Sequence, residues 1–299
     1  MPRSLELMNK IWCREKYSII ARIFENMEYS IIKGEVLSLL AYNAPNVRQS
    51  SDVDILIPKT CLKKVEEALL SNSFETECIS RYDEVMLLTS SHQTLPWHKN
   101  IYPWGNIILD LNFDIFWGEY EGKRVDMESF ISDAIEVDMF GCKVKSLPPL
   151  KAMVQLILHN YKDMNSIYLL ATRNSIKHTM FRDVYYLLKN NPDTISIEKL
   201  YTICEGYEII PYAYYVLYYT GQVFDDDALA RYVNAFRTPE GEVLLQCYGL
   251  CAKERKEWTC DFQTRLESND LFRLIKEGLN EDDKRKIAIN KRVFMGVYE

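Results

Sequence analysis

The segment Asp52-Val-Asp-Ile-Leu-Ile57, followed by Pro58, constrains the fold of this chain more than any other stretch. Acidic and aliphatic residues alternate with a period of two, which is typical of a β-strand whose two faces differ. Side chains two residues apart share a face, so we expect Asp52 and Asp54 on one face and the aliphatic residues on the other, in a core. Proline cannot donate to a strand ladder, so the strand should end at Pro58.

The paired acids of this strand indicate a cation. Two like charges roughly 7 Å apart repel unless they are solvated or neutralised, and no Lys or Arg alternates with Asp52 and Asp54. Carboxylate oxygens suit Mg²⁺, which keeps several waters and shares substrate phosphates. A strand face that is simply exposed to water is the alternative, and for an isolated Asp-x-Asp strand it is the more common case.

The residues before this strand favour a phosphate ligand. Tyr29–Lys33 forms a short β-like run that ends at Gly34, and helical character resumes from Glu35 to Tyr42. A glycine at that point lets the backbone approach a ligand closely, and the free N–H groups of a helix start attract phosphate. Lys33 adds a positive charge. The alternative is a glycine that serves only a tight strand-to-helix turn.

A third acid, Asp110, lies inside the apolar strand predicted over 107–116. An acid in such a strand requires a reason, because an unpaired buried charge is costly. Asp110 shares its face with Asn112 and Asp114, so a second solvated face is an equally good explanation.

Periodicity predicts the other elements. In the first half we expect helices over 5–27 and 62–70, the latter with Thr60 as N-cap, strands over 74–80 and 84–89, and short β elements over 135–144. After the proline-containing entry at 146–150 the apolar spacing is mostly helical, with breaks near 192, 211, 221 and 239. The sequence therefore predicts an α/β (α+β) fold, with a mixed sheet and flanking helices in a domain over 1–145 and a helical domain over 146–299.

Composition excludes several classes of protein. There are 36 Lys and Arg residues against 43 Asp and Glu residues, a net charge of −7, which disfavours a protein that coats long nucleic acid nonspecifically. The 8 cysteines are scattered and form no CxxC pair, so we expect buried reduced thiols and a cytoplasmic protein. Glu6 and Glu15 interrupt the N-terminal apolar run, which argues against a signal peptide. The apolar stretch 209–219 is too short to cross a membrane.

The order of these motifs resembles the DNA polymerase beta-like nucleotidyltransferase superfamily. The pattern is a strand, a glycine and a helix, then Arg-x-x-Ser-Asp-x-Asp, and later a single acid on a following strand. More narrowly, it is similar to the bacterial "uncharacterised nucleotidyltransferase" family. The residues that carry this likeness are Lys33-Gly34, Leu37, Tyr42, Arg48, Ser51-Asp52, Asp54 and Leu109-Asp110-Leu111, with Leu147, Leu158-His159 and Arg182-Asp183 further on.

The resemblance implies a role for each of these positions. Asp52 and Asp54 would hold one or two Mg²⁺ ions that bridge the phosphates of an NTP. Asp110 would bind the second metal ion and help to activate an acceptor hydroxyl. Gly34 would hold the triphosphate, and the resemblance makes Lys33, Arg48 and Ser51 the other candidate nucleotide-binding residues.

The implied activity is Mg²⁺-dependent transfer of a nucleoside monophosphate to a hydroxyl of a small molecule, a peptide or protein, or an RNA end, with the helical domain selecting the acceptor. The alternative is a degenerate nucleotide-binding or partner-binding protein. A third hypothesis, modification of tRNA, would need a basic strip, for which Lys33, Arg48, Lys63 and Lys64 are the candidates. Neither a membrane nor bulk nucleic acid is an expected partner.

Two positions depart from the family pattern. Many members of the superfamily have Gly-Ser where this chain has Gly34-Glu35, so an acid follows the expected phosphate site. Glu35 either points away from the phosphates, where it complements the helix dipole, or weakens triphosphate binding. The narrower family often has His at the position of Asn112. Outside the motifs, His159 and the tyrosine-rich run over 212–219 are best explained by packing in the helical half.

Overall fold

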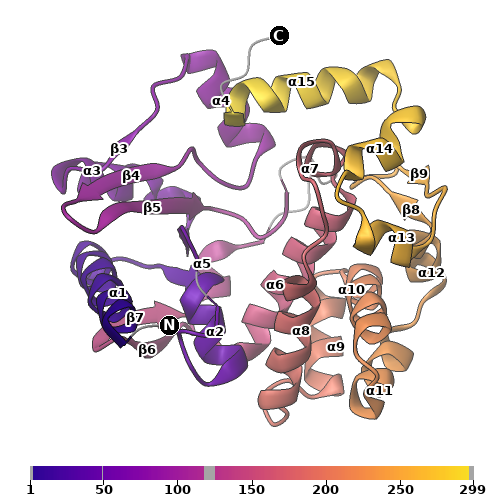
Figure 1. The fold of residues 1–299 in the computed structure, drawn as a ribbon, viewed down its shortest axis with the longest axis horizontal. Coiled ribbons are helices and arrows are strands. Elements are labelled where there is room, and N and C mark those ends of the chain that lie inside the picture. Colours follow the sequence, from indigo (N-terminus) through magenta and orange to yellow (C-terminus); the bar gives the residue numbers. More distant parts are fainter. Residues whose placement is uncertain (1–2, 49, 118–124, 296–299) are drawn as a thin grey trace. The chain divides into compact units, whose positions relative to one another are not determined.

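The computed structural model describes residues 3–48, 50–117 and 125–295. Contacts divide the chain into two compact units. The first unit comprises the described residues of Met1–Ile115 and Arg124–Ala152. The second unit comprises those of Phe116–Lys123 and Met153–Glu299. The first unit contains a mixed sheet with helices, and the second is predominantly helical (Figure 1), which confirms the predicted α/β (α+β) fold class.

The sheet of the first unit has seven strands in the order β3-β4-β5-β2-β1-β7-β6. Strand β2 pairs antiparallel with β1 and parallel with β5, so the two acid-bearing segments of the sequence are direct neighbours. The strands are β1 (Ser30–Ile32), β2 (Val53–Leu56), β3 (Glu75–Thr76), β4 (Trp97–Ile101), β5 (Gly105–Asn112), β6 (Ile135–Met139) and β7 (Cys142–Ser146).

Helices cover this sheet and complete its core. The helical segments are α1 (Arg3–Phe24), α2 (Gly34–Tyr42), η1 (Lys59–Cys61), α3 (Leu62–Ser71), α4 (Arg81–Ser90), α5 (Met127–Ile131) and the start of α6 (Pro149–Asn165). Tyr17, Ile20 and Phe24 of α1 join a buried cluster with alternate aliphatic residues of the β2 segment and of β5, namely Val53, Ile55, Ile57, Ile107, Leu109 and Leu111. The predicted orientation of Val53, Ile55 and Ile57 into a core is therefore confirmed.

Two of the predicted strands are wrong. Residues 84–89, predicted as a strand, belong to helix α4, which begins because the Ser80 hydroxyl accepts a hydrogen bond from the Asp83 amide as an N-cap. The run is apolar but short, and a short apolar run does not distinguish a strand from a helix. The strand predicted over 74–80 is only the two-residue β3, whereas β4 was missed.

The predicted cap of α3 is also wrong. Thr60 lies in the 3₁₀ turn η1, and the N-cap of α3 is Cys61, which makes no side-chain capping bond within the described residues. The Thr60 hydroxyl instead donates to Glu128 Oε1 at 2.9 Å, so a contact distant in sequence takes the group that a local cap would use.

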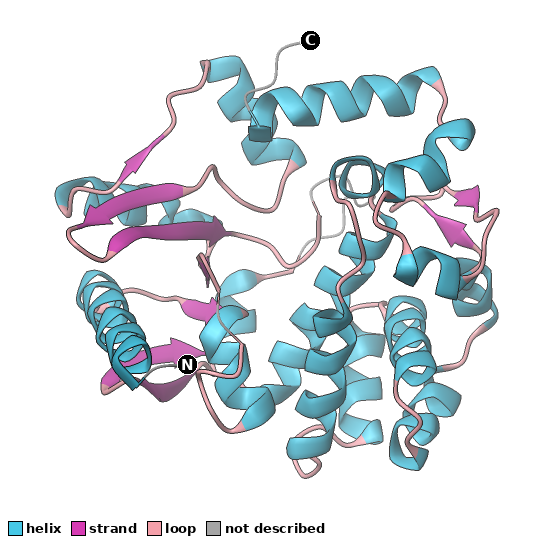
Figure 2. Ribbon diagram, in the orientation of Figure 1, coloured by secondary structure: helices cyan, strands magenta, loops and turns pink. Residues whose placement is uncertain are grey.

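The second unit is built around α10 (Ile210–Val223), which contacts α8 (His178–Asn190), α11 (Asp227–Phe236) and α12 (Pro239–Leu245). Figure 2 shows that a small two-stranded ribbon of β8 (Cys247–Tyr248) and β9 (Lys256–Glu257), which was not predicted, accompanies these helices. The remaining elements are the rest of α6, α7 (Ile167–Thr172), α9 (Ile197–Gly206), α13 (Phe262–Glu267), α14 (Leu271–Ile275), η2 (Lys276–Gly278) and α15 (Glu281–Met295).

The tyrosine-rich run lies in α10, where Tyr212, Tyr214, Tyr215 and Tyr219 are buried, as the packing interpretation predicted. The break predicted at Gly221 is wrong, because α10 continues to Val223. A glycine inside a helix costs about 1 kcal/mol relative to alanine but does not end the helix when tertiary packing supports it.

Among the residues described, no helix is long and apolar enough to span a membrane. All eight cysteines are free thiols, but only Cys204 is buried and Cys78 is exposed, so burial does not account for the others as predicted.

Candidate nucleotide-binding and catalytic site

The site is organised by the register between β2 and β5. Asp54 lies opposite Asp110 in this parallel pair, so the two carboxylates project from the same face of adjacent strands. The face is not a solvated one, because Asp54 is 7% exposed and Asn112 only 2% exposed. Asp52 and Asp110 are half-buried, so this face is partly closed and is not a simple wet surface.

The turn between β1 and α2 brings a positive charge to this face. Lys33 Nζ lies 2.7 Å from Asp54 Oδ1, and both side chains are almost nine-tenths buried. The Lys33 backbone has φ 60° and ψ −157°, a conformation that is ordinarily restricted to glycine. Such strain costs on the order of 1–3 kcal/mol and persists only where the surrounding structure enforces it. Lys33, predicted as a phosphate partner, pairs here with a carboxylate of the protein, and its nucleotide-binding role stays a prediction.

Gly34 follows with φ +50° and packs tightly against the segment before β2. A Cβ at this position would lie 3.2 Å from Ser50 Cβ and 3.9 Å from the Asp52 carbonyl oxygen. Helix α2 begins here, and its N-cap residue Lys33 makes no side-chain capping bond among the described residues. The binding of phosphate by the first amides of α2, which the glycine-and-helix motif indicated, stays a prediction.

Two side chains that the motif did not include support the acids. The Ser50 hydroxyl donates to Asp52 Oδ1 at 2.6 Å. Asn112 Nδ2 donates to the Asp110 carbonyl at 3.1 Å and approaches Asp54 Oδ1 at 3.4 Å. The period-two alternation placed Asn112 on the face of Asp110, and it could also have identified Ser50, which precedes Asp52 by two positions.

Arg48 and Ser51 are less closely tied to this group. The Arg48 amide donates to Ser38 Oγ of α2 at 3.0 Å, so the loop before β2 is anchored to the helix that follows Gly34. Ser51 is exposed, and it is Ser50, its neighbour, that bonds Asp52. The nucleotide-binding roles of Arg48 and Ser51 remain predictions.

Glu35 points to α1. Its Oε1 accepts from Lys16 Nζ at 2.7 Å and its Oε2 from the Tyr17 hydroxyl at 3.1 Å, and all three residues are buried. Burial, together with the adjacent Glu35 carboxylate, raises the pKa of Tyr17 well above its usual value. Because Lys16 neutralises it and α1 holds it, Glu35 does not present its charge to a ligand at the turn. This arrangement supports the first of the two readings of the Gly-Glu departure.

The donor set fits Mg²⁺ in part. Among the described residues, no three His, Cys, Asp or Glu side chains are grouped as a metal site, so the predicted cluster of Asp52, Asp54 and Asp110 is not preformed. Mg²⁺ in proteins is commonly bound by one or two carboxylates together with waters and substrate phosphates. The register pair Asp54 and Asp110 meets that requirement, and the metal-binding role of the three acids remains a prediction.

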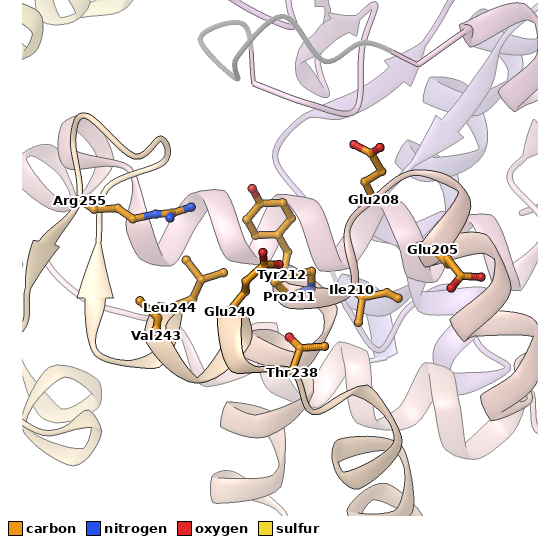
Figure 3. A pocket seen from close by; sticks show the side chains of 10 residues that line it. All are labelled: Glu205, Glu208, Ile210, Pro211, Tyr212, Thr238, Glu240, Val243, Leu244 and Arg255. Atoms are coloured by element: carbon orange, nitrogen blue, oxygen red, sulfur yellow. The ribbon is translucent and has the colours of Figure 1, made fainter.

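A separate cavity of about 620 Å³ lies in the second unit. Figure 3 shows its lining, with Glu205 and Arg255 at opposite ends and Tyr212 and Glu240 between them. None of the predicted site residues lines it. In the same unit, His159 Nε2 lies 3.3 Å from Asp163 Oδ2, a helix (i, i+4) pair on α6.

One known protein family matches most of this chain. The model of the family described as "Uncharacterised nucleotidyltransferase" matches residues 10–225, which is most of the chain and includes every predicted site residue. No curated protein matches the chain significantly.

Among solved structures, the chain is similar to an antigenic nucleotidyltransferase-like protein from Paracoccidioides brasiliensis. The two share 17% identity with a TM-score of 0.40, over 73% of this chain and 90% of the other. A likeness at this level carries no argument beyond the family match. The family model matches residues 10–225, and the extent of this match shows that the chain belongs to the uncharacterised nucleotidyltransferase family.

Proposed function

We propose that this protein transfers a nucleoside monophosphate from an NTP to a hydroxyl group of an acceptor and releases pyrophosphate. The observation that carries the proposal is the pairing of Asp54 with Asp110 on adjacent strands, beside the Lys33–Gly34 turn that begins α2. Membership of the family supports an NTP as the donor.

In the proposed reaction the acceptor oxygen bonds to the α-phosphorus as the bond to the pyrophosphate oxygen breaks. Bound Mg²⁺ would neutralise charge on the attacking and departing oxygens. Asp52, Asp54 and Asp110 would hold it, and the Asp110 carboxylate is the candidate acceptor for the hydroxyl proton. The amides of the first α2 turn and the Lys33 ammonium would bind the triphosphate.

The acceptor is more consistent with a small molecule or a peptide than with bulk RNA. The chain has a net charge of −7. Of the lysines considered for a basic strip, Lys33 is directed to Asp54 within the site, whereas Lys63 is a largely exposed side chain 3.9 Å from Glu67. The free thiols are consistent with a cytoplasmic location.

The test is transfer of label from each α-labelled NTP to a cell extract with Mg²⁺. We expect Asp54→Asn to abolish transfer while its circular dichroism shows a folded protein, because the amide oxygen can still accept from the buried Lys33 ammonium. Asp138→Asn, on strand β6 of the same sheet, is the matched control and should retain transfer. Equal labelling by the Asp54 variant would reject this site.

The second candidate function is nucleotide binding without turnover. One observation favours it. The Lys33 ammonium donates to Asp54 Oδ1, although Asp54 is proposed to bind the metal ion. A protein of that kind would bind NTP in equilibrium dialysis, lose binding on Lys33→Met, and form no labelled product with any of the four NTPs.

A further inference from the structure

We propose that Lys33 is a built-in competitor of the metal ion at Asp54, and that it couples metal binding to nucleotide binding. The inference rests on the proposed function and concerns how the same site is regulated. It is carried by the ion pair of 2.7 Å between Lys33 Nζ and Asp54 Oδ1, whose side chains are 12% and 9% exposed.

Lys33 and a metal ion would compete for a single oxygen atom of Asp54. An ammonium at 2.7 Å from Asp54 Oδ1 and a metal ion on that oxygen would repel each other at close range in a weakly screened setting. Asn112 approaches the same oxygen at 3.4 Å, so the ammonium and an amide are both directed to it. A metal ion can bind through Oδ1 only after Lys33 has moved away.

A bound nucleotide would offer the Lys33 ammonium another partner. It is the residue directly before Gly34 and the N-cap of α2, so it lies at the helix start that the proposed triphosphate would occupy. Phosphate oxygens are alternative partners for an ammonium. A nucleotide would therefore draw Lys33 from Asp54 and release the carboxylate for the metal ion, so each ligand should favour the other's binding.

The backbone conformation of Lys33 is consistent with a side chain that the ion pair holds in place. Lys33 has φ 60°, which an L residue rarely adopts, and the ion pair to Asp54 is a contact that holds it there. Removal of the charge can be separated from removal of this strain, because methionine keeps the backbone penalty whereas glycine relieves it.

The test is Mn²⁺ affinity without nucleotide, measured by electron paramagnetic resonance of the free ion. We expect Lys33→Met to bind Mn²⁺ about tenfold or more tightly than the unchanged protein, and Lys33→Gly to show the same gain because the charge is the cause. Asp54→Asn added to Lys33→Met should remove the gain. Lys256→Met is the matched control, since Lys256 Nζ also lies 2.7 Å from a carboxylate oxygen, that of Asp283, in a pair whose side chains are 16% and 5% exposed.

Unchanged or weaker Mn²⁺ binding by a folded Lys33→Met protein would overturn the inference. If that variant does not fold, Lys33→Gln decides, because its neutral amide can still donate to Asp54; a gain of about threefold or more supports the inference and no gain rejects it. The readout requires no turnover, so an inactive protein would refute the proposed transfer reaction while leaving this result intact.

Discussion

At the residue scale, Glu35 shows how a side chain that departs from a family motif is accommodated. The acid follows Gly34, yet its two oxygens bond Lys16 and Tyr17 of α1. The ion pair is buried at both ends, with 6% and 4% of the side chains exposed. Removing one partner of a buried ion pair costs more stability than replacing both, because the remaining charge is left uncompensated.

We therefore predict that Lys16→Met destabilises the protein by roughly 3–5 kcal/mol in urea unfolding. The double variant Lys16→Met with Glu35→Gln should recover a large part of that loss, because the remaining amide can still accept from Tyr17. The exposed pair Lys63–Glu67 is the control, where Lys63→Met should change stability by less than about 1 kcal/mol. A loss of the same size at both sites would contradict the buried-charge explanation.

Gly34 yields a second prediction at this scale. Gly34→Ala places a Cβ 3.2 Å from Ser50 Cβ, at a φ of +50°. We expect a loss of about 1–2 kcal/mol from the left-handed backbone and, in addition, weaker NTP binding, because Ser50 and its partner Asp52 must shift. Gly141→Ala has the same kind of φ, +86°, with nothing within 4 Å, so it should lose stability without loss of NTP affinity in calorimetric titration.

The sequence identified Asp54, Asp110 and Gly34 because each stands in a local pattern, an alternation or a strand-to-helix junction. The contacts of Lys33 with Asp54 and of Glu35 with Lys16 join residues 21 and 19 positions apart. No local pattern specifies such pairs. They follow from the pairing of β1 with β2 and from the side chains of α1 that reach the start of α2.

At the element scale, the segment 80–101 contains one element that a local sequence signal specifies and one that depends on pairing with a distant strand. Here the hydrophobic pattern predicted a strand at 84–89, whereas the structure has helix α4 followed by strand β4. Ser80 with Asp83 is an N-cap signal, and the Ser80 hydroxyl also donates to Asp83 Oδ2 at 2.7 Å. That signal outweighs a short apolar run. Strand β4 has a mixed sequence and is defined by pairing with β5, which periodicity does not reveal.

We predict that Ser80→Ala destabilises α4 by about 1 kcal/mol, the usual cost of a lost N-cap. The amides of α4 should exchange with solvent roughly fivefold faster, while those of β5 stay protected. Ser71→Ala, which removes an exposed hydroxyl that donates to the Glu67 carbonyl, is the control and should lie within about 0.5 kcal/mol of the unchanged protein. Unchanged exchange in the Ser80 variant would show that α4 does not depend on its cap.

At the scale of the whole molecule, the core of the helical unit contains weakly acidic groups. Burial raises the pKa of the Cys204 thiol from 9.0 to about 12, and burial also raises the pKa of Tyr219. The folded protein therefore retains protons that the unfolded chain has already released. The stabilisation from these groups is fully present below their unfolded pKa values and is lost as the pH rises above them.

We therefore predict that the free energy of unfolding decreases between the unfolded and folded pKa values of Cys204, from pH 9.0 to about 12. Urea unfolding from pH 8 to 11 measures this slope. Cys204→Ala should be less stable at pH 8 because of the cavity, but its stability should fall less steeply with pH. A stability that is constant up to pH 11 would contradict the assignment.

The parallel pairing of β2 with β5 has a consequence for synthesis of the chain. Strand β2 leaves the ribosome about fifty residues before the strand that completes it, so a nascent chain that ends before Gly105 exposes one edge of β2 with its hydrogen-bonding groups unpaired. The same interval separates Asp54 from Asp110. The need for a chaperone should therefore end at the same stage of translation at which the carboxylate pair forms, when β5 emerges and pairs with β2.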